Sequence, residues 1–503
     1  MHLPPIGLRP RVLHVTQPVD GGVARVVTDL TRAQLAAGLR VSVACPEGGL
    51  ADRLRALRAD VRPWAATRSP GRALPVEVGR LARVIEDVRP DLVHAHSAKA
   101  GLAARLAVRG RVPTVFQPHA WSFEAAGGPT GVLALGWERW AARWAARTVC
   151  VSEAERLRGA RAGIRGRWAV VPNGVDTDRF HAGSGPGPDD AQDVRRRHGI
   201  GPHNPLVVCV GRLCRQKGQD VLLTAWESVL ARVPDARLVL AGDGPDRAAL
   251  TARASANGLL DEPGAAAPPG RHTPARHTPA PPGRHTPAPP PGRGATASVL
   301  FTGAVSDASG WYRAADLVVL PSRWEGMALA PLEAMACGRP VVVTDVDGAR
   351  EALPPALAPR CLVPPEDPEA LADAVAGLLL DAPLRASLAR DGHAHVRSAH
   401  DVRHTATAVA RLYGAVLDAA RPSDRATAPG PHRALACDDT RTAARRPAPA
   451  TTGPAARRPA PGDLGQADVP RKHGMPLKRT EPLKRVEPFE CVEPFECRES
   501  THP

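Results

Sequence analysis

The sequence is poor in the features that mark several large classes of protein. Aromatic residues make up 3% of its 503 residues, and no motif interleaves them with basic side chains as RNA-binding modules do. We therefore expect no nucleic-acid partner, despite a net charge of +15. No run of about 18 apolar residues is present, so we predict no membrane-spanning helix. The N-terminus, Met-His-Leu-Pro-Pro, lacks the pattern of a secretory signal, and we expect a cytoplasmic protein.

Cysteine and lysine are also scarce. The nine cysteines show no metal-ligand spacing, and five lie in apolar runs that predict reduced, buried thiols, namely Cys45, Cys150, Cys209, Cys337 and Cys361. Nearly every basic residue is arginine, and most of the surplus positive charge lies in residues 1–180. This asymmetry fits a first domain that faces an anionic substrate or the anionic inner face of the plasma membrane. A generally basic amino-acid composition is an equal alternative.

Short apolar strands alternate with amphipathic helices along most of the chain. In the first 180 residues, strands are expected at Arg11–Thr16, Arg40–Cys45, Asp60–Trp64, Asp91–His94, Thr114–Phe116 and Thr148–Val151. After a Gly- and Pro-rich linker, further strands are expected at Leu206–Val210, Arg237–Ala241, Ser298–Thr302, Asp316–Leu320, Pro340–Thr344 and Arg360–Val363. This alternation predicts an α/β fold with two doubly wound, Rossmann-like domains, over 1–180 and 190–400, followed by a helix over 401–420.

Two segments have compositions that cannot bury a core. Residues 262–297 repeat Arg-His-Thr-Pro-Ala between Pro- and Gly-rich spacers, and residues 421–503 end in Pro-Leu-Lys-Arg and Pro-Phe-Glu-Cys repeats. We predict a disordered insertion and a disordered tail. The histidines of the insertion could hold a metal adventitiously, but repeat expansion without a role is the simpler interpretation.

The stretch 321–333 joins a buried strand to the predicted helix Leu329–Ala336. It carries two carboxylates eight residues apart, Glu325 and Glu333. In open α/β sheets, ligands bind at the carboxyl ends of the strands, and the N–H groups of a helix start suit an anion. Two acids at that place suit sugar or ribose hydroxyls. For Glu333, an acid that complements the helix dipole is an equal alternative.

A glycine-bounded loop opens the first helix of the second domain. It runs from Gly211 to Gly218 and carries Arg212 and Lys217. A forked guanidinium, a compact ammonium and a helix N-terminus are the groups that hold a diphosphate. The alternative is a solvated basic loop.

Polar residues also follow strands of the first domain. His94 and His96 would face the same way on a strand and could form a metal pair, but no third ligand at useful spacing is evident, so we predict no metal site. His119 lies in a loop at the ligand side and could donate to a sugar hydroxyl. In other enzymes an Asp-x-Asp motif such as Asp345-Val-Asp347 holds a metal on a sugar nucleotide, but here we predict a helix-capping turn.

Six motifs in order resemble family 4 retaining glycosyltransferases of the GT-B type, which place two Rossmann-like domains around a cleft. The resemblance covers about residues 11–420. The motifs are the Gly21-Gly22 loop, His94-Ala-His-Ser-Ala-Lys-Ala-Gly101, Gln117-Pro-His-Ala120, Val171-Pro-Asn-Gly-Val-Asp176, Gly211-Arg-Leu with Gln216-Lys-Gly218, and Glu325-x7-Glu333 with Ala334-Met-Ala. One position departs from the family pattern, because Ala328 stands where glycine is usual.

The resemblance implies transfer of a sugar from a nucleoside-diphosphate sugar, with no metal or other cofactor, to a cell-envelope polysaccharide, lipid-linked or small-molecule acceptor. It implies that His119 and Glu325 are catalytic. It implies a donor site made of Gly22, Arg212, Lys217, Gly326, Met327, Ala328, Leu329 and Glu333. The last helix would cross back onto the first domain. A sugar-nucleotide epimerase or a non-catalytic nucleotide-sugar-binding protein on the same fold is the alternative.

Overall fold

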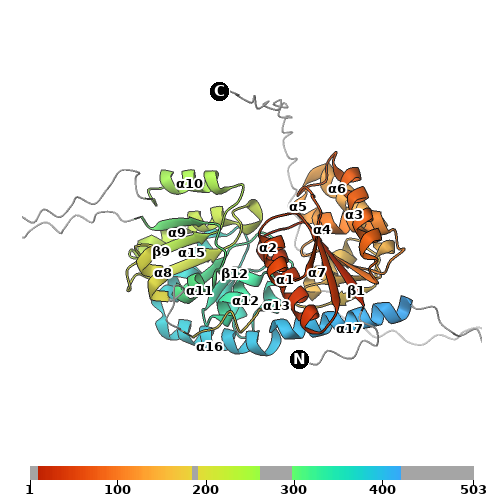
Figure 1. Ribbon diagram of the computed structural model, residues 1–503. Helices are drawn as coiled ribbons and strands as arrows, with labels where there is room; N and C mark the ends of the chain where they lie inside the picture. The colour runs from red at the N-terminus through yellow and green to blue at the C-terminus, as the bar shows by residue number, and fades with distance from the viewer. Residues whose placement is uncertain (1–9, 184–190, 261–296, 421–503) are drawn as a thin grey trace, which may run out of the picture. The chain divides into compact units, whose positions relative to one another are not determined.

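The computed structural model describes residues 10–183, 191–260 and 297–420. The predicted tail at 421–503, and the predicted insertion at 262–297 except for its last residue, lie outside the described residues. Within the described part, strands and helices alternate as expected, and every strand pairing inside the two sheets is parallel. The predicted α/β class with two doubly wound sheets is confirmed (Figure 1).

The first sheet has seven strands in the order β3-β2-β1-β4-β5-β6-β7. Its strands are β1 (Arg11–Thr16), β2 (Arg40–Cys45), β3 (Asp60–Pro63), β4 (Leu92–His96), β5 (Thr114–Gln117), β6 (Arg147–Cys150) and β7 (Trp168–Val170). The strand order reverses between β1 and β4, and such a switch point opens a crevice at the carboxyl ends of the strands.

Helices connect the strands of the first sheet and cover both of its faces. They are α1 (Gly21–Ala36), α2 (Gly49–Ala56), α3 (Leu74–Val88), α4 (Ala98–Val108), α5 (Ser122–Ala125), α6 (Gly128–Ala141) and α7 (Glu153–Arg161), with a 3₁₀ turn, η1, at Ala142–Trp144. Successive residues of a strand point to opposite faces. Accordingly, Val12 packs in a cluster with Val27 of α1, whereas Leu13 packs with Leu81 of α3.

The second sheet has six strands in the order β10-β9-β8-β11-β12-β13. They are β8 (Leu206–Val210), β9 (Arg237–Ala241), β10 (Val299–Gly303), β11 (Leu317–Leu320), β12 (Val341–Thr344) and β13 (Leu362–Val363). Its switch point lies between β8 and β11. Apart from Cys209, these two strands consist of Leu and Val, and all their residues except Val210 are buried, as expected for parallel strands covered on both faces.

The second sheet is also covered by helices. They are α8 (Ala191–Arg197), α9 (Gln219–Arg232), α10 (Arg247–Ala256), α11 (Ser309–Ala314), α12 (Leu329–Ala336), α13 (Ala349–Ala352), α14 (Ala358–Cys361), α15 (Pro368–Leu380) and α16 (Ala382–Ala399). A 3₁₀ turn, η2 (Arg215–Lys217), precedes α9. The five cysteines predicted in apolar runs are buried and free.

The chain passes between the two sheets twice, and the two crossings touch. Val175, after β7, forms a parallel bridge with Asp401, and the Asn173 carbonyl accepts a hydrogen bond from the His400 ring at 3.0 Å. From there the last helix, α17 (Val402–Ala420), packs on α1 of the first sheet. Among the described helices, none is both long and apolar enough to cross a bilayer.

Candidate functional site

The loop after β8 and the turn after β11 lie next to each other at the switch point of the second sheet. Gly218 ends the loop with φ +65°, and a Cβ at this position would overlap the Pro321 carbonyl oxygen. Only glycine therefore allows the loop to approach the end of β11 so closely. As a result, the Lys217 ammonium bonds to Glu325 Oε1, and the Ser322 hydroxyl donates to the same oxygen at 2.7 Å.

Arg212 begins the same loop and is half-buried. Its carbonyl accepts a hydrogen bond from the Gln219 amide at 3.0 Å, which holds the loop on the start of α9. Within the part of the chain that the structure describes, the Arg212 guanidinium has neither a hydrogen-bond nor an ion-pair partner. This half-buried cation, in the same loop as Lys217, is therefore free to take an anion.

The turn at 325–328 is held from the first sheet by two side chains. The Ser152 hydroxyl donates to the Gly326 carbonyl at 2.8 Å, and the Asn173 amide donates to the Met327 carbonyl at 2.7 Å. A Cβ on Gly326 would lie 3.1 Å from the Ala120 nitrogen. The glycine thus lets the turn touch the segment that carries His119.

The His119-Ala120 segment has an unusual backbone that one buried carboxylate supports. The φ angles of His119 and Ala120 are +55° and +88°, in the left-handed region that non-glycine residues rarely adopt. Glu155 of α7 accepts from the Ala120 N–H at 2.6 Å and from the Val151 N–H at 2.7 Å. Burial raises the pKa of Glu155 to about 7.

Glu155 is not among the residues predicted for the site, although its spacing from Ser152 is a recognisable signal. Ser152 and Glu155 have the spacing of a capping box, in which the glutamate normally bonds back to the helix start. The Ser152 hydroxyl does accept from the Glu155 N–H at 3.0 Å. The Glu155 carboxylate, however, accepts from the N–H groups of Val151 and Ala120 instead. Its bond to Ala120 forms because β5 and β6 pair side by side, which the local sequence does not reveal.

His119 is a neutral ring at physiological pH, because burial lowers its pKa to about 3. Its Nε2 lies 3.2 Å from Nδ1 of His96. His96 is in turn next to His14 of β1, with 2.9 Å between His96 Nε2 and His14 Nδ1. No third ligand for His94 and His96 is evident from spacing in the sequence, but His14 of the neighbouring strand β1 brings a third imidazole to them. The absence of a metal site stays a prediction.

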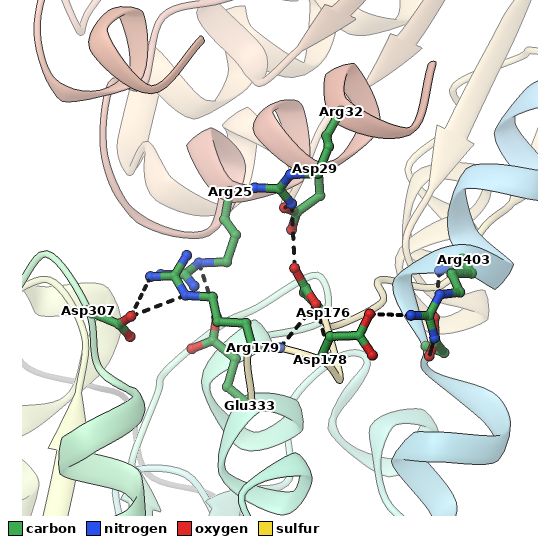
Figure 2. A network of polar contacts seen from close by, with 10 residues as sticks. Arg25, Asp29, Arg32, Asp176, Asp178, Arg179, Asp307, Glu333 and Arg403 are labelled. Carbon is green, nitrogen blue, oxygen red and sulfur yellow. Dashed lines mark hydrogen bonds and ion pairs between the residues drawn. The ribbon is translucent and has the colours of Figure 1, made fainter. Parts of the chain in front are cut away.

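Helices α1 and α12 meet through their first turns. A Cβ on Gly22 would lie 3.6 Å from the Leu329 side chain. Arg25, one turn further along α1, places its Nε 3.1 Å from Oε1 of the buried Glu333 (Figure 2). The Tyr312 hydroxyl donates to Oε2 of Glu333 at 2.9 Å. Both Glu333 oxygens are thus engaged by protein groups, and one of these groups, the Arg25 guanidinium, comes from helix α1, which covers the first sheet.

Further ion pairs surround this contact in Figure 2. Arg179 pairs with Asp307 at 3.0 Å, and Arg403 pairs with Asp178. Burial raises the pKa of the neighbouring Asp29 to about 6, although Arg32 lies 2.8 Å away.

The predicted capping role of Asp345-Val-Asp347 is wrong. Gly348 is the N-cap of α13, and no side chain caps that helix. Asp347 instead pairs with Arg158 of α7, and Asp345 pairs with Arg350. Both carboxylates are therefore neutralised by arginines.

The structure brings most of the predicted site residues together in two contacts. Lys217 meets Glu325, and the Gly326–Leu329 turn meets the first sheet at Ala120 and Gly22. Ala328 is the N-cap of α12 with an ordinary φ of −70°, so the departure from glycine causes no backbone strain there. The roles of these residues toward a ligand stay predictions.

Comparison with protein families gives three matches along the chain. A model described as Glycosyltransferase Family 4 matches residues 20–179. Two models described as Glycosyl transferases group 1 match residues 190–262 and 285–381. The matched ranges fall on the first and second sheets respectively.

Curated relatives match about half of the chain. The lipopolysaccharide core biosynthesis mannosyltransferase LpsB of Rhizobium meliloti is 30% identical over 49% of this chain and 61% of its own length. D-inositol 3-phosphate glycosyltransferase 2 of Catenulispora acidiphila is 35% identical over 52% of each chain. A GDP-mannose-dependent phosphatidylinositol monomannoside mannosyltransferase of Mycolicibacterium smegmatis is 34% identical over 43% of this chain and 48% of its own. The chain thus spans about half to three-fifths of these relatives.

Solved structures share the fold over a longer stretch. The Anabaena protein HepE, solved with UDP and glucose, superposes with a TM-score of 0.65 at 21% identity and covers 81% of this chain and 100% of its own. WaaG, described as a glycosyltransferase involved in lipopolysaccharide biosynthesis, has a TM-score of 0.59 at 17% identity and covers 80% of this chain and 99% of its own.

Proposed function

We propose that this chain, which belongs to the family 4, group 1 glycosyltransferases and has their GT-B fold, moves a sugar from a nucleoside-diphosphate sugar to an acceptor with retention of configuration. The observation that carries the proposal is the contact between Lys217 and Glu325 at the switch point of the second sheet, beside a turn that Ser152 and Asn173 hold against the first sheet. The acceptor class is a cell-envelope polysaccharide, a lipid-linked glycan or a small molecule.

The diphosphate of the donor would be held by positive charge. Lys217 supplies an ammonium and Arg212 a guanidinium without a partner among the described residues. The start of α12 adds backbone N–H groups at the end of the same turn. Lys217 is already paired with Glu325, and a diphosphate with a higher negative charge would compete for its ammonium.

The transferred sugar would lie between Glu325 and His119. When the diphosphate takes the ammonium, the Glu325 carboxylate becomes an acceptor for sugar hydroxyls. Nε2 of the neutral His119 ring is engaged with His96 Nδ1, so Nδ1 is the ring nitrogen left to bond a sugar hydroxyl. The neutral ring therefore orients hydroxyls without bringing a positive charge close to an anomeric carbon that becomes cationic in the transition state.

The proposed reaction needs no protein nucleophile. The bond between the anomeric carbon and the diphosphate oxygen breaks, and the acceptor oxygen attacks from the same face. The acceptor proton passes to an oxygen of the leaving diphosphate. Lys217 and Arg212 would stabilise the charge that develops on that diphosphate, which is the effect that preorganised cations supply best.

The relatives differ in their printed donors and acceptors, so the test begins with the donor class. Purified protein is screened by thermal shift against UDP, GDP, ADP and their common sugars, because a ligand that binds the folded state raises the melting temperature. Donors that bind are then assayed for transfer to endogenous glycan and lipid acceptors, with NMR of the product to read the anomeric configuration. Stabilisation by one nucleotide class and a retained product support the proposal. No stabilisation by any of them, or an inverted product, overturns it.

We also propose that α6 contacts an anionic membrane surface. Val132 and Leu133 of this helix are 72% and 74% exposed, and Trp140 is 47% exposed. The exposed Arg143 lies over the Trp140 ring, with 4.4 Å from its guanidinium carbon to the ring centroid. Apolar side chains next to bases are the composition of an interfacial helix.

Vesicle flotation tests this contact. Vesicles with phosphatidylglycerol should retain the wild-type protein, and phosphatidylcholine vesicles should retain less. Replacing Val132 and Leu133 with serine should release the protein. Leu380→Ser is the matched control, because Leu380 is 65% exposed on α15 of the second sheet. If the vesicles retain all three proteins equally, or if both kinds of vesicle retain the wild-type protein equally, α6 is not the contact with an anionic membrane.

A further inference from the structure

Three buried histidines converge on one face of the first sheet. His14 of β1 stands in register with His94 of β4, and His96 follows two residues later on the same side of β4. All three side chains are fully buried. Two adjacent strands therefore bring three imidazoles into one place beneath α1 and α17.

One nitrogen of each ring points into the group. His14 Nδ1 and His96 Nε2 are 2.9 Å apart. His94 Nε2 is buried and makes no hydrogen bond of ordinary geometry among the described residues, and the nearby Gln117 amide oxygen is likewise buried without one. The three rings offer ligand atoms that all lie within 4.8 Å of one another. A buried polar nitrogen without a partner is unfavourable, and a ligand inside the group would satisfy it.

The other nitrogen of each ring is hydrogen-bonded outside the group. His14 Nε2 lies 2.8 Å from the Gln34 amide oxygen, and His94 Nδ1 lies 2.6 Å from the Tyr413 hydroxyl. His96 Nδ1 lies 3.2 Å from His119 Nε2. Histidines that hold a metal almost always make such an outer hydrogen bond, which fixes the ring orientation and the bare nitrogen that binds the ion.

We propose that His14, His94 and His96 form a binding site for a zinc-type divalent transition metal. Three imidazole nitrogens suit Zn²⁺, Co²⁺, Ni²⁺ or Cu²⁺ and do not suit Mg²⁺ or Ca²⁺, which prefer oxygen ligands. Zinc binds imidazole nitrogen at about 2.0–2.1 Å, so the nitrogens of one site lie within about 4.2 Å of each other. In tetrahedral coordination such bonds put the nitrogens about 3.4 Å apart. The hydrogen-bonded His14 and His96 nitrogens, now 2.9 Å apart, would therefore open slightly around the ion, within a group whose ligand atoms all lie within 4.8 Å of one another. A water or hydroxide would complete four-coordination.

The metal would link β1 to β4 and would not take part in sugar transfer. Its link to the proposed donor site passes through His96. A metal on His96 Nε2 leaves the ring proton on Nδ1, and this proton is donated to His119 Nε2. His119 then carries its own proton on Nδ1. The metal is thus a structural group that also fixes the tautomer of His119.

The direct test is the metal content of the full chain. Protein is loaded with zinc, passed through a desalting column and analysed by inductively coupled plasma mass spectrometry. About one zinc per chain is expected, and His14→Gln should lower the content at least fivefold. The histidines at 272, 277 and 285 lie in the repeat segment, so a second protein with all three changed to alanine should retain its zinc. His395→Gln, a change of a histidine far along the chain in α16, is the matched control.

X-ray absorption at the zinc edge makes the test independent of any variant. Three imidazole nitrogens at about 2.0–2.1 Å are expected in the wild-type protein. A zinc content below one-tenth per chain, loss of zinc only in the repeat variant, unchanged zinc in His14→Gln, or a thiolate shell would overturn the proposal. Each of these readings is independent of sugar transfer, so failure here is distinguishable from failure of the proposed function.

Discussion

Arg25 of α1 and Glu333 of α12 form an ion pair across the two sheets, with 3.1 Å between Nε and Oε1. The Glu333 side chain is 6% exposed and that of Arg25 is 23% exposed. Tyr312 takes the second Glu333 oxygen. The Glu333 carboxylate, which was expected to bind a ribose, is therefore already paired with the Arg25 guanidinium of helix α1. A donor ribose would have to share or displace this contact.

Loss of the Arg25 side chain should destabilise the protein measurably. Arg25→Met keeps most of the volume but leaves a buried carboxylate unpaired. We expect a loss of about 2–3 kcal/mol in the free energy of unfolding, less than for a fully buried pair because Arg25 is partly exposed. Urea unfolding measures it. Arg55→Met is the control, because both partners of its pair with Glu47 are exposed, at 46% and 58%, and its loss should change the free energy of unfolding far less. Equal losses in the two variants would contradict the assignment.

The contact between Lys217 and Glu325 should be essential for transfer. Lys217→Ala and Glu325→Gln are each expected to lower kcat/KM at least tenfold, because each removes a group that would contact the charged or reacting part of the donor. Steady-state release of nucleoside diphosphate measures this. Arg215→Ala removes an exposed cation from the same 3₁₀ turn and should leave the rate within twofold. Wild-type turnover in both site variants would remove these residues from the mechanism.

Glu155 should make stability depend on pH with a definite sign. Its folded pKa of about 7 lies above the ordinary glutamate value of 4.5, so the folded state binds more protons than the unfolded state between these values. Stability contributed by this group therefore falls as pH rises from about 4.5 to 7, by up to about 3 kcal/mol in total. Glu124 and Asp347 add to the upward shift.

The difference between wild type and Glu155→Gln isolates this effect. The lowered pKa values of His14 and His119 act in the opposite direction, because the unfolded state then binds more protons at low pH. Both proteins contain these histidines, so their effect cancels in the difference. Urea unfolding at pH 5, 6, 7 and 8 should show the wild type losing stability relative to the variant as pH rises. A difference that is constant with pH would refute the raised pKa.

Gly326 should tolerate no side chain. A Cβ there would lie 2.9 Å from both Glu155 Oε1 and Val151 Cγ2, so Gly326→Ala must push the turn away from the first sheet. We expect at least a tenfold loss of kcat/KM, because the turn carries Glu325. Gly377→Ala in helix α15 is the control. Nothing lies within 4 Å of a Cβ at position 377, and alanine there should stabilise the helix by up to about 1 kcal/mol. Full activity in Gly326→Ala would show that the turn at Gly326 does not pack against Glu155 and Val151 of the first domain.

The sequence predicted the elements with long apolar or periodic runs and missed those without them. Strands β1, β2, β8 and β9 and helix α12 begin and end where expected, because the apolar pattern of each is local in the sequence. Strand β7 was missed, since Trp168–Val170 is short and only half-buried. The short helices α5, α13 and α14 have four residues each, too few to show a helical period.

The site was predictable where family motifs mark it and not where distant strands meet. Lys217 and Glu325 were found separately, and the structure adds their contact. His14 was missed as a partner of His94 and His96, because the pairing of β1 with β4 is not visible in local spacing. Arg25 was missed for the same reason, since its partner Glu333 lies 308 positions later in the chain. Long-range contacts of this kind require the fold.

The proposed donor site depends on Lys217 at the switch point of the second sheet. Isothermal titration calorimetry of the wild-type protein with its best nucleoside-diphosphate sugar, and of Lys217→Ala under the same conditions, tests it most directly. We expect one donor per chain and at least tenfold weaker binding to the variant. Equal affinity of the two proteins, or no binding of any UDP-, GDP- or ADP-sugar to the wild type, would contradict it.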